Sequence, residues 1–279
     1  MAIYVMSDIH GHARALDEVL SLASPGDDDR VYVLGDMVDR GPEPVDVIRC
    51  VRALPNVQVL MGNHERMLLD VLLDTGEMDS FTWALNGGFA TATGLDVLDR
   101  DEYTELIDWM SGLPLYDVVD TADRRYILAH AGFDPMEARA FLATAGVDVS
   151  EGRGAAEASR ELLLDMLSRQ ASETLLWVRE EFWGQPTGLV GRDGTGPVVV
   201  VGHTPSIVLA SYADRMANEG ADEEGRGLVV PVGACDDTDG VADRIDIDCS
   251  AAAGAPRGRV GIVRLDDGAA WYAAIRDGE

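Results

Sequence analysis

The strongest constraint on the fold is a threefold alternation of apolar and helical segments within the first 75 residues. The stretches 3–12, 31–36 and 57–64 each begin with an apolar run and end in polar residues. Segments with helical spacing of apolar side chains follow them, at 13–23, 43–53 and 65–73. Repetition of strand, polar loop and helix is typical of α/β folds that carry ligand groups at the carboxyl ends of their strands. We therefore expect an α/β protein with its functional residues at these ends.

The remainder of the chain predicts further strands and one largely helical insertion. Residues 78–112 have a helical pattern, and strands are predicted at 115–119, 125–130 and 197–205. Residues 134–184 are mostly helical, and we interpret them as an insertion that borders the active site. Four closely spaced strands near the end predict antiparallel pairing, at 226–232, 243–249, 259–266 and 269–275. Without internal repeats or a clear linker, residues 1–279 are expected to form a single domain.

The composition of the chain indicates the cellular compartment in which the protein is expected. No stretch approaches the 18 or so consecutive apolar residues that a membrane helix requires, so no membrane association is expected. The first residues lack the basic start and long apolar run of a signal peptide. The three cysteines, Cys50, Cys235 and Cys249, are scattered and odd in number, which is typical of a reducing compartment. These features predict a cytoplasmic protein.

The charge of the chain limits what it binds. The formal net charge is −28, and all 22 basic residues are arginine. So acidic a chain is not expected to bind nucleic acid, because phosphate backbones require basic patches. The absence of lysine excludes a P-loop, whose lysine contacts the phosphates of a nucleotide. A phosphorylated substrate would therefore be captured locally, by metal ions and a few arginines.

The five histidines are concentrated after the predicted strands. They occur in the clusters SDIHGH, GNHE, HAG and GHTP, and a fifth cluster, GDMVDRGP, carries Asp36 and Asp39 without histidine. Carboxylate oxygen, imidazole nitrogen and an asparagine carbonyl together suit a hard or borderline divalent metal. The absence of cysteine from the clusters argues against a structural zinc site. The pattern predicts a metal centre at the strand ends.

At this level of detail the sequence resembles a known group of enzymes. The order D-x-H, G-D-x-x-D-R-G, G-N-H-E, H-A-G and G-H-T, within residues 7–205, resembles the metallophosphoesterase superfamily. More narrowly, it is similar to bacterial serine/threonine protein phosphatases of the phosphoprotein phosphatase type, and the IDID segment near the C-terminus is similar to their final strands. The resemblance implies a metallo-dependent phosphatase fold, in which two mixed β-sheets form a sandwich flanked by helices.

The resemblance also implies roles for individual residues. Two divalent metal ions would be bound, with Asp36 bridging both, by Asp8, His10, Asp36, Asn63, His130 and His203. Manganese is the family expectation, although iron or zinc suits the same ligands. His64 would donate a proton to the leaving oxygen, and Asp39 would orient His64 and favour its protonated form. Arg40 would bind phosphate oxygens, and Arg179 is the candidate for a second phosphate-binding arginine.

The predicted function is metal-dependent hydrolysis of phosphate monoesters, chiefly phosphoserine and phosphothreonine in proteins, by a water that two metal ions activate. The alternative is a dinucleoside polyphosphate hydrolase, for example of diadenosine tetraphosphate. That group often lacks the aspartate of D-R-G and often carries GNHD, so Asp39, Arg40 and Glu65 favour the monoesterase. Glu65 itself is interpreted as a helix N-terminal residue and not as a ligand.

The residues at two positions, 61 and 12, do not identify the substrate. Many phosphatases of this type carry an arginine just before GNHE, where this chain has Met61, so one phosphate contact is missing. His12 has no role in the motif, and we interpret it as a hydrogen-bonded neighbour of the ligands.

A third hypothesis, from a different class of function, is a binding or scaffold protein with a degenerate site. The presence of every expected ligand argues against it, and the oligomeric state stays open.

Overall fold

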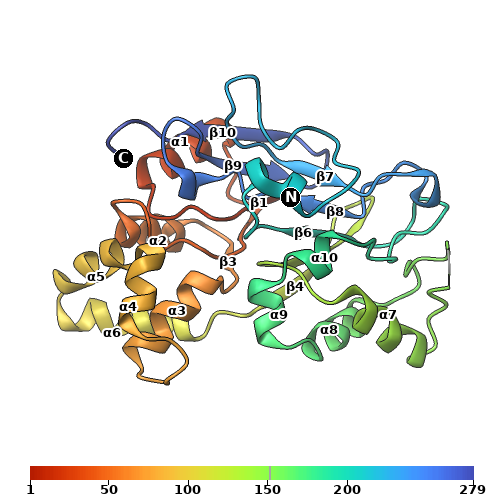
Figure 1. Ribbon diagram of the computed structural model, residues 1–279, viewed down its shortest axis with the longest axis horizontal. Coiled ribbons are helices and arrows are strands. Elements are labelled where there is room, and N and C mark those ends of the chain that lie inside the picture. The colour runs from red at the N-terminus through yellow and green to blue at the C-terminus, as the bar shows by residue number, and fades with distance from the viewer. Residues whose placement is uncertain (151) are drawn as a thin grey trace.

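The computed structural model describes residues 1–150 and 152–279, in which two five-stranded sheets pack face to face with helices outside (Figure 1). In the first sheet the strand order is β10-β9-β1-β2-β3. Its strands are β1 (Ile3–Met6), β2 (Arg30–Val33), β3 (Val57–Val59), β9 (Arg259–Arg264) and β10 (Ala270–Ala274). The strands β1, β2 and β3 are parallel, whereas β9 is antiparallel to β1 and to β10. The predicted sandwich of mixed sheets is confirmed.

The second sheet has the order β4-β5-β6-β8-β7. Its strands are β4 (Tyr116–Asp120), β5 (Arg125–Ala129), β6 (Val198–Val201), β7 (Val230–Val232) and β8 (Arg244–Asp246). The central strands β5, β6 and β8 are parallel, and the two edge strands β4 and β7 are antiparallel to their neighbours. Five strands of the two sheets, β1, β2, β3, β5 and β6, therefore precede the five predicted motif clusters.

The pairing predicted for the last four strands is only partly right. The pairs β7–β8 and β9–β10 are antiparallel as expected, but they belong to different sheets, and β8 is parallel to β6. The strands β7 and β8 are also shorter than predicted. Burial explains the placement of β9, whose residues 260–263 are all buried and so suit an inner position between β1 and β10.

Alternation along the strands divides the interior into three apolar clusters. In β1, Ile3 and Val5 point between the sheets, whereas Tyr4 and Met6 point toward the helices. The outer face of the first sheet is covered by α1 (Ala13–Ala23), α2 (Pro44–Ala53), α3 (Asn63–Leu72) and α6 (Arg100–Ser111). The outer face of the second sheet is covered by α7 (Pro135–Thr144), α8 (Arg160–Ser168), α9 (Ser172–Trp177) and α10 (Glu180–Trp183).

Both predicted helical regions are interrupted. Residues 78–112 form α4 (Ser80–Trp83), the π-helical turn η1 (Ala84–Gly88), α5 (Phe89–Asp96) and α6, and Gly87 has a left-handed φ of 101° inside η1. The 134–184 insertion consists of the four short helices α7 to α10 joined by loops, with residue 151 outside the described residues. Within the described ranges, no helix has the length and apolar character needed to cross a membrane.

A buried arginine fastens the insertion to the second sheet. The side chain of Arg244, on β8, is 4% exposed, and its Nη1 donates hydrogen bonds to the carbonyl oxygens of Phe182, Trp183 and Gln185. Its Nε donates to the carboxylate of Asp243, at 3.0 Å. This guanidinium therefore supplies a charged donor to three carbonyls at the end of α10 and to a buried carboxylate that also accepts hydrogen bonds from the backbone N–H and Oγ1 of Thr187.

We expect Arg244→Leu to lower the free energy of unfolding by about 3–5 kcal/mol, because the substitution leaves the Asp243 carboxylate and the carbonyls buried without this partner. Urea denaturation measures the effect. The matched control is Arg169→Leu, which removes a surface ion pair with Asp165 and should cost less than about 1 kcal/mol. Equal losses in the two variants would contradict the anchoring role.

Candidate metal centre

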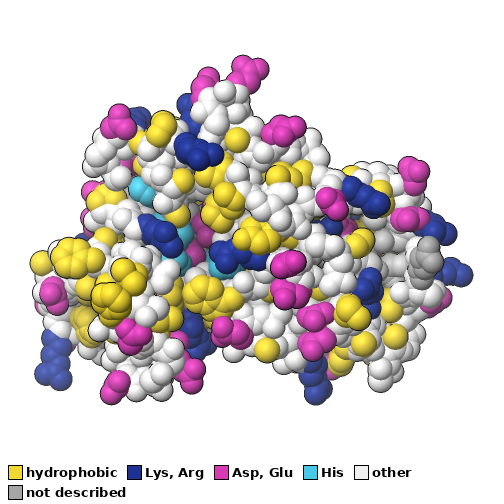
Figure 2. Space-filling view, in the orientation of Figure 1, with side chains coloured by type: hydrophobic (Ala, Val, Ile, Leu, Met, Phe, Trp, Pro, Cys, Tyr) yellow, Lys and Arg dark blue, Asp and Glu magenta, His cyan; other side chains and the backbone are white. Residues whose placement is uncertain are grey.

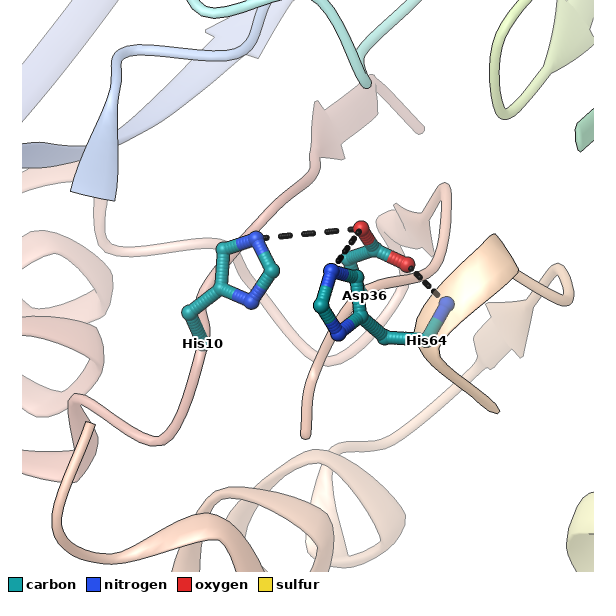
Figure 3. A group of neighbouring side chains, drawn as sticks. All are labelled: His10, Asp36 and His64. Carbon is teal, nitrogen blue, oxygen red and sulfur yellow. Dashed lines mark hydrogen bonds and ion pairs between the residues drawn. The ribbon is translucent and has the colours of Figure 1, made fainter. Parts of the chain in front are cut away.

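The predicted ligands converge at the carboxyl ends of strands from both sheets. Asp36, after β2, is central, because its Oδ2 lies 3.7 Å from Nε2 of His10 and 3.5 Å from Nε2 of His130. Figure 3 shows His10, Asp36 and His64 pointing toward one another from three separate segments. Asp8 lies beside His10, with 3.9 Å between its Oδ1 and the Nε2 of His10.

A second set of donor atoms adjoins the first. Oδ1 of Asn63 lies 2.8 Å from Nε2 of His130 and 3.0 Å from Nδ1 of His203. Two groups of potential ligand atoms, each within 4.8 Å of one another, share the carboxylate of Asp36: one contains His10 and His64, the other His130 and His203. The structure thus brings all six predicted ligands together around two adjacent positions, with Asp36 between them.

The donor set fits divalent cations. The gaps of 3.5–3.9 Å between imidazole nitrogens and Asp36 are too long for hydrogen bonds, and a cation with bonds of about 2.0–2.2 Å could span them. Burial, followed by the charges of Asp8 and Glu65, raises the pKa of Asp36 well above its usual value. Burial likewise lowers the pKa of His10 and His203, which favours the neutral imidazole that binds a metal.

Backbone carbonyls orient two of the imidazoles. Nδ1 of His10 donates to the carbonyl oxygen of Val38 at 3.0 Å, and Nδ1 of His130 donates to that of Leu34 at 2.8 Å. In both rings the Nε2 atom therefore remains available as a donor atom of the cluster. Hydrogen bonds of this kind fix the tautomer and the ring orientation of histidine ligands.

Unusual backbone conformations aim these side chains. Six predicted site residues have φ between 48° and 68°, in the left-handed region: Asp8, His10, Asp36, Asp39, Arg40 and His203. Outside glycine this region costs roughly 1–3 kcal/mol per residue and is concentrated at functional sites. Here it turns the chain sharply directly after β1, β2 and β6, so that polar side chains at the strand ends face the cluster.

Glu65 has a larger role than a helix N-terminal residue. Its buried carboxylate accepts hydrogen bonds from the backbone N–H groups of Asp36, Met37 and Gly62, at 2.7, 2.7 and 2.9 Å. It therefore ties the loop after β2 to the start of α3, where Asn63 and His64 lie. The acidic residue of the GNHE motif marks this position in the sequence, but the sequence does not show which backbone groups its carboxylate binds.

His64 is held by a buried carboxylate, as predicted. Its Nδ1 donates to Oδ2 of Asp39 at 2.7 Å, and Asp39 also accepts from Nε1 of Trp83 at 3.0 Å and Oγ1 of Thr91 at 2.6 Å. Burial raises the pKa of Asp39 to about 6. Burial, then the charges of Arg40 and His130, lowers the pKa of His64, which opposes the protonated form that Asp39 was expected to favour. The role of His64 as proton donor therefore stays a prediction.

The two predicted phosphate-binding arginines lie at different ends of the cluster. Arg40 is exposed, and its charge lowers the pKa of His10 and His64. Nη2 of Arg179 donates to the carbonyl oxygen of His203 at 3.2 Å, and its charge lowers the pKa of His203. Met61, at the position where an arginine was expected, is buried in the core and offers no phosphate contact.

Two buried carboxylates near the cluster were not predicted. Asp246 and Asp248, in the IDID segment, are almost fully buried. Burial, followed by the charge of Asp8, raises the pKa of Asp248. In the sequence they stand out as two acidic residues within an apolar stretch. Burial of such carboxylates costs free energy unless a cation lies near. His12 is buried at the start of α1, outside both ligand groups, and has a backbone hydrogen bond with Ala251.

Two mixed sheets with paired histidine and aspartate groups at the strand ends define the class of metal-dependent phosphoesterases. Residues 1–230 match the family described as calcineurin-like phosphoesterase, and the chain belongs to this family. The family consists of hydrolases that use a dimetal centre, in agreement with the two ligand groups that share Asp36.

Two curated relatives each match about half of this chain. A symmetrical bis(5'-nucleosyl)-tetraphosphatase of Erwinia tasmaniensis is 34% identical over 138 residues, which is 48% of this chain and 46% of that protein. A protein of the same name from Yersinia enterocolitica is 33% identical over 144 residues, or 48% of this chain and 43% of that protein. The chain thus spans about half the length of the curated relatives it matches.

Solved structures support the fold. A putative diadenosine tetraphosphatase has a TM-score of 0.57 at 17% identity, covering 99% of this chain and 94% of that one. A metallophosphoesterase from Sphaerobacter thermophilus has a TM-score of 0.50 at 18% identity, covering 99% and 88%. At these identities the likeness concerns the fold alone. The narrower resemblance to serine/threonine protein phosphatases is not confirmed by these comparisons.

We expect addition of Mn²⁺ to the chelator-treated protein to raise its melting temperature by about 5–10 °C. A ligand at 100 times its Kd stabilises by about 2.7 kcal/mol, and each kcal/mol shifts the melting temperature by about 2–4 °C at this size. Differential scanning calorimetry with metal analysis measures this. Asp36→Asn should remove the response, whereas Asp134→Asn, which replaces the N-cap of α7, should retain it. A full response in Asp36→Asn would refute a site built on Asp36.

Proposed function

We propose that this chain hydrolyses dinucleoside polyphosphates and cleaves the symmetrical tetraphosphate into two nucleoside diphosphates. The observation that carries the proposal is the 34% identity over 138 residues with a symmetrical bis(5'-nucleosyl)-tetraphosphatase. The same name recurs in relatives from several Yersinia species. The proposal thus prefers the alternative substrate over the phosphoprotein that the motifs first favoured.

The arrangement of side chains suits hydrolysis of a phosphate bond. In the reaction the oxygen of a water bonds to phosphorus in line, and the bond from phosphorus to the bridging oxygen breaks. Metal ions bound by Asp8, His10, Asp36, Asn63, His130 and His203 would lower the pKa of a shared water toward neutrality and neutralise phosphate charge. We propose these six residues as the ligands of two divalent ions, with Mn²⁺ as the family expectation and iron or zinc compatible with the same donors.

The other residues of the site would act on the phosphate and on the leaving group. Arg40 and Arg179 would neutralise non-bridging oxygens, where charge accumulates in the transition state. Once its Nε2 is protonated, His64 would supply the proton that the departing oxygen takes up, and Asp39 would hold the ring through Nδ1, so that Nε2 faces the cluster. No covalent intermediate with the protein is required.

Hydrolysis of phosphate monoesters, including phosphoserine and phosphothreonine in proteins, is the second candidate. The buried pair of His64 and Asp39 favours it, because a serine or threonine alkoxide is a poor leaving group that needs a general acid. A nucleoside diphosphate is a far better leaving group and depends less on such an acid. The two candidates therefore make different demands on the same histidine.

A substrate panel tests the proposal directly. We expect kcat/KM for diadenosine tetraphosphate to exceed that for a phosphoserine peptide by about tenfold or more, equivalent to about 1.4 kcal/mol of transition-state stabilisation. Chromatography of the products should show ADP alone, since symmetrical cleavage yields two identical halves. A higher kcat/KM for the phosphopeptide would favour the second candidate, and formation of AMP with ATP would exclude symmetrical cleavage.

Substitution of His64 tests its role as the proton donor. We expect His64→Gln to lower kcat by about 10²–10⁴-fold for phenyl phosphate, because general acid catalysis contributes about that much. The loss should be smaller for p-nitrophenyl phosphate, whose leaving group needs less protonation. Metal content, measured in parallel, should stay at the wild-type level. Equal losses on the two esters would argue that His64 serves as a metal ligand instead.

A further inference from the structure

A row of exposed apolar side chains lies on the helical segment next to the metal centre. Phe81, Leu85 and Phe89, here called the apolar ridge, are 70%, 73% and 77% exposed. They are spaced four residues apart along the consecutive helical segments α4, η1 and α5. Figure 2 shows hydrophobic side chains gathered over the region of α4 and α5, beside the hollow that contains the histidines.

The apolar ridge is joined to the catalytic motif through the π-helical turn. The N–H of Arg40 donates to the carbonyl oxygen of Gly87 at 3.1 Å. A Cβ atom added to Gly87 would lie 3.1 Å from Cγ of Arg40, so the stem of Arg40 packs against the backbone between Leu85 and Phe89. The opposite face of the same segment supplies Trp83 and Thr91 to Asp39. The ridge therefore adjoins the His10 and His64 end of the cluster.

The other end of the cluster carries a second apolar group. Trp177, at the end of α9, is half-buried, and its ring centroid lies 5.9 Å from that of His203 with the rings nearly perpendicular. Arg179 follows two residues later and donates to the carbonyl oxygen of His203. Each end of the cluster thus combines one arginine with one apolar surface, although Trp177 packs against the same apolar cluster as α4 and α5.

We propose that the apolar ridge and Trp177 each bind one nucleobase of a dinucleoside polyphosphate, with Arg40 and Arg179 on the phosphates between them. This inference rests on the proposed function. A symmetrical substrate has its scissile bond at the centre, and in-line attack directs its two halves away from the metal centre in opposite directions. Two base-binding surfaces, one at each end, match that symmetry.

The net charge of the chain favours base stacking as a source of affinity at both surfaces. The chain carries a net charge of −28, so its overall field opposes binding of a polyanion. The two arginines and the bound metal ions would act locally on the phosphates, and contacts to the bases would add affinity that the overall charge does not oppose. Stacking of a base on an aromatic ring is such a contact, and it contributes about 1–3 kcal/mol per base, or roughly 5- to 150-fold in affinity.

The test uses the metal-loaded full chain and variants that remove one surface at a time. The double variant Leu85→Ser/Phe89→Ser and the variant Trp177→Leu should each raise KM for diadenosine tetraphosphate roughly 5- to 150-fold. Each should also weaken inhibition by ADP, with p-nitrophenyl phosphate as the reporter, while inhibition by inorganic phosphate stays at the wild-type level. Trp177→Phe should recover most of the loss, because it keeps an aromatic ring.

Met136→Ser provides the matched control, since Met136 is 63% exposed on α7, away from the centre. An unchanged KM in the ridge and Trp177 variants, or an equal rise in Met136→Ser, would overturn the base-binding proposal and leave the proposed function standing. Failure of the wild type to cleave diadenosine tetraphosphate would instead reject the proposed function. A loss confined to phosphoprotein substrates would identify the ridge as a protein-docking surface and overturn the nucleobase assignment.

Discussion

The geometry of the centre depends on the buried carboxylate of Glu65. By accepting three backbone N–H groups, it ties the loop after β2 to the first turn of α3, and so places Asp36 relative to Asn63 and His64. The two segments touch backbone to backbone, since a Cβ atom on Gly35 would lie 2.3 Å from the nitrogen of Gly62. Burial raises the pKa of Glu65, and the hydrogen bonds from the backbone N–H groups oppose that rise because they stabilise the charged carboxylate.

Desolvated charge is the second constraint on the centre. Asp8, Asp36, Asp246 and Asp248 are almost fully buried within one region, and burial lowers the pKa of His10 and His203. Such a collection of carboxylates is unfavourable unless cations or hydrogen bonds compensate it. The left-handed backbone at the strand ends adds a further cost. Binding of divalent ions at the two ligand groups would offset both costs.

Much of the fold and of the candidate site could be predicted from the sequence, because the informative residues lie directly after strands. Asp8 and Asp36, for example, each follow a buried run, and parallel pairing of β1 with β2 brings their carboxyl ends together. The sheet assignment of the last strands could not be predicted, since β8 beside β6 and β9 beside β1 are contacts between distant segments. The π-helical turn at Gly87 was equally invisible, because the flanking residues have ordinary helical spacing.

The sequence by itself determined the chemistry of the donors, since each ligand belongs to a short local motif and its side chain decides what it can bind. It also determined the alternation of strands and helices, which follows from local periodicity. Only the tertiary structure decided which groups surround those donors. Packing of the two sheets brings Asp248 near Asp8 and places Trp177 against His203, while the helices outside the first sheet carry the apolar ridge to Arg40. These placements depend on contacts between residues far apart in the chain, which no local pattern encodes.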